Sequence, residues 1–162
     1  MEVLPSINDS KDENYQTVIK QIISLMEGEP DPIANLANAS SILKNMFRYF
    51  SWVGFYRRER DELVLGPFQG KPACTRLKIG RGVCGTSYAE KRTVIVPRVE
   101  DFPGHIYCDP DSKSEIVVPI RRSDGTLWGV LDVDSDRYAA FDLVDAQYLE
   151  EMTELISKTT LN

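Results

Sequence analysis

The stretch that decides the fold is a candidate β-hairpin over residues 115–134, EIVVPIRRSDGTLWGVLDVD. Two apolar, β-branched runs flank the sequence SDGT at 123–126, and Asp-Gly is a strong hairpin-turn signal. If the turn has two central residues, Asp124 and Gly125, then Ser123 pairs with Thr126, and each step back along one strand matches a step forward along the other. Counting in this way places Glu115 opposite Asp134. The same register brings Asp132 onto the neighbouring position of the same sheet face, because strand side chains alternate.

This register predicts a cluster of three carboxylates, Glu115, Asp132 and Asp134, on a face that also carries Trp128 and Val130. Like charges that face each other across strands are destabilising, so the presence of three neighbouring carboxylates calls for an explanation. One interpretation is a solvated outer face, or a bulge that changes the register. The other is a pocket for a cationic group, or a shared proton held at a raised pKa. A divalent metal is a further candidate, but no loop has the carboxylate spacing of a calcium motif.

Outward from the hairpin, apolar spacing predicts helices over residues 12–28, from Asp31 onward, after Gly82 and from Asp142 onward. Strands are predicted at 52–56, 63–65, 75–79, 93–96, 115–120 and 127–133. Residues 97–114 form a long, proline-interrupted connection, which is a candidate functional loop. The fold class is therefore α+β, with a mainly antiparallel sheet of about six strands and the N- and C-terminal helices packed on one face.

The composition narrows the functional classes. The chain has 162 residues, 42% of them hydrophobic, and a net charge of -6. One domain is expected, with residues 1–12 as a flexible tail. An acidic chain without a basic stretch or a long apolar run is a poor candidate for binding nucleic acid or membrane. The N-terminal segment resembles neither a signal nor a transit peptide, so we expect a cytoplasmic protein.

All three cysteines, Cys74, Cys84 and Cys108, fall within one short window, and each has a glycine, proline or charged residue close by. Cysteines that serve only as core filler are usually surrounded by aliphatic residues, whereas exposed, tuned thiols lie on bends. The pattern indicates thiol redox chemistry, with any disulfide in a reducing compartment being transient. His105 either lowers the pKa of Cys108 or, as we favour, fixes the loop through a backbone hydrogen bond.

Six strings in order support a family resemblance: WVGFY at 52–56, LGPFQGKPAC at 65–74, GVCGT at 82–86, FPGH at 102–105, SEIVVP at 114–119 and GVLDVDS at 129–135. The chain resembles the free methionine-(R)-sulfoxide reductases, which are stand-alone GAF domains. The resemblance implies a GAF-like fold for residues 1–162 as a single domain. One departure is Tyr107, where the family more often has alanine.

The resemblance also implies roles for individual residues. Cys108 matches the nucleophile, Cys84 the resolving thiol and Cys74 an auxiliary thiol. Glu115 or Asp134 would protonate the sulfoxide oxygen, and Asp132 would hold the substrate ammonium group. The aromatic wall of the pocket matches Trp52 and Tyr56.

The implied activity is reduction of free methionine-(R)-sulfoxide through a sulfenic acid and an intramolecular disulfide, which thioredoxin recycles. No cofactor or metal is implied, and a homodimer through the terminal helices is expected. Two other classes stay open: a GAF domain that only binds a small ligand, and a redox or metal sensor whose cysteines report. The chain length leaves no room for the output domain that sensors usually carry, which favours the enzyme.

Overall fold

A six-stranded sheet forms the centre of the computed structural model, which describes residues 10–162. In chain order the elements are α1 (Lys11–Met26), α2 (Pro32–Met46), β1 (Trp52–Glu59), β2 (Glu62–Gln69), β3 (Arg76–Lys78), α3 (Gly82–Glu90), β4 (Val94–Val96), the 3-10 turn η1 (Val99–Asp101), β5 (Ser114–Arg121), β6 (Leu127–Ser135) and α4 (Leu143–Thr160). The strand order is β3-β2-β1-β6-β5-β4, and each neighbouring pair is antiparallel.

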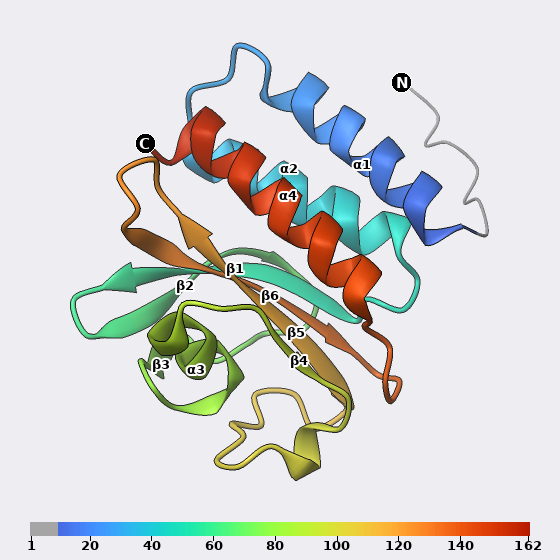
Figure 1. Ribbon diagram of the computed structural model, residues 1–162, viewed down its shortest axis with the longest axis vertical. Coiled ribbons are helices and arrows are strands. Elements are labelled where there is room, and N and C mark those ends of the chain that lie inside the picture. The colour runs from blue at the N-terminus through green and yellow to red at the C-terminus, as the bar shows by residue number, and fades with distance from the viewer. Residues whose placement is uncertain (1–9) are drawn as a thin grey trace.

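The two faces of the sheet are covered differently. Helices α1, α2 and α4 lie on one side of the sheet, where α2 and α4 pack against the strands and α1 packs on these two helices; the short α3 and the long loop before β5 lie on the other side (Figure 1). Alternation along β1 divides its side chains, so that Val53 and Phe55 join the helix-side core and Trp52 and Tyr56 join the opposite one. The predicted α+β class and the packing of terminal helices on one face are confirmed.

A buried carboxylate ties the first helix to the last. Asp142 caps α4, the helix expected from Asp142 onward, and Asp145 completes a reciprocal capping box. Asp145 also accepts hydrogen bonds from the hydroxyls of Tyr15 (2.8 Å) and Tyr49 (2.6 Å), and lies 2.7 Å from the Lys11 ammonium. These bonds compensate the burial of the carboxylate and hold the helical layer together.

Most of the expected tail, residues 1–9, lies outside the described residues. The rest of it is ordered, because Ser10 caps α1 and the helix already begins at Lys11. In residues 10–162 no helix is both long enough and apolar enough to span a membrane.

The β5–β6 hairpin has the predicted pairing at the site but not the predicted turn. Glu115 pairs with Asp134, as expected. The turn has three residues rather than two: Arg122 accepts a bond from Gly125 and donates one to Thr126, and Gly125 has φ +84°. A three-residue loop with glycine in the left-handed region is a common hairpin type.

A bulge then restores the register that the longer turn removes. Ile120 pairs with Gly129 but Arg121 pairs with Leu127, so Trp128 is the extra residue on β6. The prediction that Trp128 shares the carboxylate face is therefore wrong: its side chain packs against the helix-side core. Val130 lies on the carboxylate face as predicted.

We expect the substitution Gly129→Ala to destabilise the sheet where β1 and β6 meet. An added Cβ would overlap the Tyr56 carbonyl oxygen and lie 2.8 Å from Arg57 Cα, and both are backbone atoms that cannot rotate away. Overpacking of this kind costs about 1–3 kcal/mol or more of unfolding free energy. Urea unfolding followed by circular dichroism measures it, with the exposed Glu154→Ala on α4 as control. Equal midpoints for the two variants would contradict the close approach.

Candidate active site

A cavity of about 50 Å³ lies on the sheet face that α3 and the long loop cover. It is lined from β1 by Trp52 and Tyr56, from α3 by Cys84, from β5 and β6 by the three carboxylates, and from the loop by Cys108. Every residue predicted for the site lines this cavity except Cys74, which joins it through a bond to Cys108.

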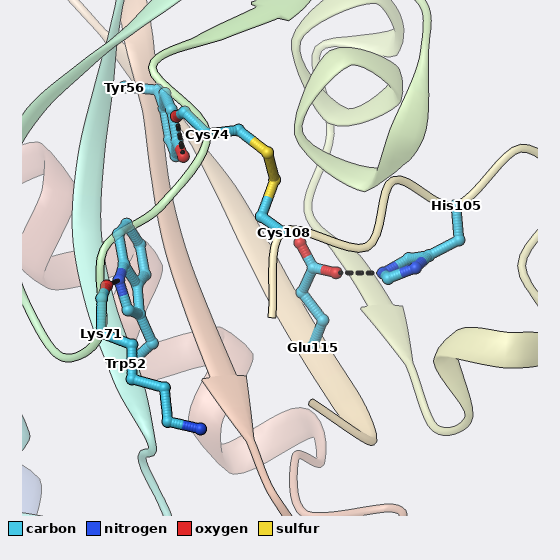
Figure 2. Close-up of a disulfide and its surroundings, with 7 residues drawn as sticks. All are labelled: Trp52, Tyr56, Lys71, Cys74, His105, Cys108 and Glu115. Atoms are coloured by element: carbon cyan, nitrogen blue, oxygen red, sulfur yellow. Dashed lines mark hydrogen bonds and ion pairs between the residues drawn. A yellow bond between two sulfur atoms is a disulfide. The ribbon is translucent and has the colours of Figure 1, made fainter. Parts of the chain in front are cut away.

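The aromatic wall is anchored to the loop that carries Cys74. The Trp52 indole Nε1 donates to the Lys71 carbonyl at 3.0 Å, and the Tyr56 hydroxyl donates to the Cys74 carbonyl at 2.9 Å (Figure 2). The two rings stack with centroids 6.1 Å apart. Gly54 allows this, because a Cβ there would overlap the Trp52 ring. Burial raises the pKa of Tyr56 far above its usual range, so its hydroxyl stays a donor.

The three carboxylates converge from adjacent strands. Glu115 and Asp132 are each 6% exposed, and Asp134 is half-buried and accepts a hydrogen bond from Ser112 at 3.3 Å. Burial raises the pKa of all three groups well above the usual range, and their mutual repulsion raises it further. The cluster therefore retains a proton at a pH where exposed carboxyls are ionised, which suits a proton donor.

His105 contacts the carboxylate cluster from the loop. Its Nε2 lies 3.2 Å from Glu115 Oε2, and both side chains are almost fully buried (Figure 2). Burial lowers the pKa of His105, so the neutral ring is favoured and this contact is a hydrogen bond more than an ion pair. The favoured expectation, a bond to backbone, is wrong: the partner is the Glu115 side chain.

The structure contains one disulfide, between Cys74 and Cys108, with Cα atoms 5.5 Å apart (Figure 2). Cys84 is a free thiol, 4% exposed, in the first turn of α3. Burial, followed by the nearby carboxylates, raises the pKa of the Cys84 thiol well above its usual value.

The expected pairing of Cys108 with Cys84 therefore needs correction. Cys74 and Cys108 are both on loops, at a Cα separation typical of disulfides, whereas Cys84 is held inside a helix. The sequence offers three possible pairs among three cysteines, and spacing along the chain cannot choose between them.

Further contacts hold the loop that carries Cys108, and no motif in the sequence indicates them. Lys71, on the loop that carries Cys74, forms ion pairs with Asp109 (3.5 Å) and Asp111 (2.5 Å), which closely follow Cys108 in the chain. On the Cys108 loop Ile106 packs against Gly82, where a Cβ would come within 3.1 Å of it. Lys71 belongs to the sequence string at 65–74, but its ion-pair partners, Asp109 and Asp111, come close only because the two loops pack together in the tertiary structure.

Comparisons with known proteins agree with this architecture. The family model described as the GAF domain matches residues 31–159. A curated yeast protein, the free methionine-R-sulfoxide reductase of Saccharomyces cerevisiae, is 42% identical over 94% of this chain and 91% of its own. The Escherichia coli protein of the same name is also 42% identical, over 92% of this chain and 90% of its own.

A solved structure, described as the free methionine-R-sulfoxide reductase of Neisseria meningitidis in complex with its substrate, is 47% identical. It superposes with a TM-score of 0.93 and covers 98% of this chain and 95% of its own. Identity at this level along nearly the whole length, on the same fold, shows common descent. The chain therefore belongs to the GAF domain family and, within it, to the free methionine-(R)-sulfoxide reductases.

Proposed function

We propose that this protein reduces free L-methionine-(R)-sulfoxide to L-methionine with Cys108 as the nucleophile. One observation supports this most: a disulfide, through Cys108, lines the same cavity as a buried carboxylate cluster and an aromatic wall. The relatives named for this activity make the substrate class specific. A domain that only binds a ligand would need the carboxylates but not the disulfide.

The proposed chemistry uses each group once. The Glu115–Asp134 pair protonates the sulfoxide oxygen, which makes the sulfur electrophilic. The Cys108 thiolate attacks that sulfur, methionine leaves, and the oxygen stays on Cys108 as a sulfenic acid. A second thiol displaces the oxygen as water and forms a disulfide. The sum is one sulfoxide and two thiols converted to one sulfide, one disulfide and water.

We assign the resolving step to Cys74 rather than Cys84. The observed pairing, the position of both partners on loops and the ion pairs of Lys71 between those loops support this choice. The buried Cys84 has a raised pKa, which disfavours the thiolate needed for attack. An external dithiol protein of the thioredoxin type then reduces the Cys74–Cys108 bond by exchange.

The substrate pocket is assigned by charge and shape. Asp132 holds the ammonium group, while Trp52 and Tyr56 pack the methylthio end through sulfur–aromatic contacts. Enclosure of the amino-acid end would exclude a peptide-bound residue. A cytoplasmic location accords with a catalytic disulfide that must be reduced in each cycle.

We also propose that the helical layer forms a homodimer. Four large apolar side chains are exposed on it: Ile23 (49%) and Leu25 (49%) on α1, Ile33 (68%) on α2 and Leu143 (80%) on α4. A second copy of the chain is the occupant we infer, since the active-site face stays open for substrate.

The thiol assignments predict three different kinetic phenotypes. Cys108→Ser should abolish methionine release, because serine provides no comparable nucleophile. Cys74→Ser should release one equivalent of methionine and then stop with thioredoxin as reductant. Cys84→Ser should continue to turn over.

Rapid-quench measurement of methionine with a chiral sulfoxide substrate separates these outcomes. If Cys84→Ser stops after one turnover while Cys74→Ser cycles, Cys84 is the resolving thiol and our assignment is wrong. Full activity of Cys108→Ser would remove the mechanism itself.

The acid role predicts that Glu115→Gln or Asp134→Asn slows the chemical step by about 10²–10⁴-fold, the usual contribution of a positioned general acid. Because the raised pKa keeps the cluster protonated to higher pH, wild-type activity is present below that pKa and lost as pH rises through it. Asp132→Asn should raise KM more than it lowers kcat. Single-turnover rates across pH measure both effects, and unchanged chemistry in Glu115→Gln would contradict the acid role.

If the protein is a dimer through this layer, placing charged residues in the interface should halve its mass in solution. The double variant Ile33→Glu, Leu143→Glu should elute as a monomer where the parent is a dimer, since burying two carboxylates in an apolar interface is costly. Light scattering coupled to size exclusion measures the mass, with Asp61→Ala in the distant β1–β2 turn as control. A monomeric parent protein would contradict the proposal.

A further inference from the structure

A thiol and two carboxylates meet at the base of the active-site cavity. Cys84 Sγ and one carboxylate oxygen each from Glu115 and Asp132 lie within 4.8 Å of one another, and all three residues are buried. They come from three different elements, α3, β5 and β6, so the sheet and helix together hold them in place. We propose that this triad is a binding site for a thiophilic divalent cation, Zn²⁺ above all.

An independent feature points to a missing positive partner. Asp132 Oδ1 is buried and has no hydrogen-bond partner, although Asp132 lines the cavity and is only 6% exposed. Among residues 10–162, no lysine or arginine forms an ion pair with Asp132 or Glu115, and His105 is the single basic group that reaches Glu115. An unpaired buried carboxylate oxygen is costly, and a bound cation would remove that cost.

The donor set selects the kind of cation. Zn²⁺ accepts sulfur and carboxylate oxygen together, and three protein ligands with one open position are typical of reactive zinc sites. Mg²⁺ and Ca²⁺ prefer all-oxygen sites with more ligands, so the thiol disfavours them. The cavity of about 50 Å³ has room for the ion and for water in the open position.

His105 supplies the outer support that such sites use. Its Nε2 bonds to Glu115 Oε2 at 3.2 Å, which leaves the other Glu115 oxygen for the metal. Outer hydrogen bonds of this type orient a ligand, and their loss typically weakens metal binding by about 10–100-fold.

Cobalt(II) provides a direct test, because a cobalt–thiolate bond absorbs in the near ultraviolet. In the variant Cys74→Ser, Cys108→Ser only Cys84 can give that band, and we expect it to appear with Co²⁺ and to disappear when Zn²⁺ displaces the probe. Adding Cys84→Ser should abolish the band. The oxidised parent protein, in which Cys84 is the single free thiol, gives the same test without any substitution. Absence of the band in both proteins would overturn the proposal.

The carboxylate ligands are tested by affinity. Zn²⁺ competition against a chromogenic chelator should show weaker Zn²⁺ binding for Asp132→Asn. His105→Ala should lower the Zn²⁺ affinity by about 10–100-fold, a smaller loss than that of Asp132→Asn. Glu154→Gln, exposed on α4, should bind as the parent does. Circular dichroism confirms that each variant is folded. Parent-like affinity of folded Asp132→Asn would overturn the assignment.

Occupancy by a cation should also exclude the substrate, and this consequence rests on the proposed function. Asp132 cannot hold both the metal and the ammonium group of methionine sulfoxide. Saturating methionine sulfoxide should therefore remove the cobalt band from the Cys84-only variant, which cannot turn the substrate over. A band that persists would overturn the competition, whereas the absence of the band from the start overturns the metal site and leaves the reductase proposal untouched.

Discussion

The register between β5 and β6 is the constraint on which the rest of the site depends. A shift of one residue would turn Asp132 and Asp134 to the helix-side core, which is built from buried apolar side chains and offers no partner for a charge. With the observed register the two carboxylates face Glu115, and β1 adds Trp52 and Tyr56 on the same side. The sheet thus positions the carboxylates and the aromatic wall, and the loops add the two cysteines of the disulfide.

Burying carboxyl groups close together raises the free energy of their ionised forms, and the proposed chemistry depends on that effect. Glu115 and Asp132 are almost inaccessible, and no lysine or arginine pairs with them among residues 10–162. In such surroundings a carboxyl keeps its proton, so it can donate to a sulfoxide oxygen, or it attracts a cation. A proton, the substrate ammonium group and a metal ion would each neutralise the same buried negative charge.

The loop that carries Cys108 is held firmly over the cavity. Cys108 lies on a loop that is held in three ways: by the bond to Cys74, by the ion pairs of Lys71, and by His105 on Glu115. Of these, the disulfide is the one covalent link, and it joins the Cys108 loop to the Cys74 loop. The hydrogen bond from Tyr56 to the Cys74 carbonyl joins the aromatic wall to the same pair of loops.

Local chemistry in the sequence determined the elements, the capping box at Asp142 and the pairing of Glu115 with Asp134, because propensity, periodicity and turn signals act over short distances. Even there the pairing was right although the turn was not: a third loop residue and the bulge at Trp128 offset each other. Which thiols meet was decided only by tertiary structure. Cys74, Cys84 and Cys108 lie on separate elements, and the distances between them depend on how the loops pack over α3, which no local signal encodes.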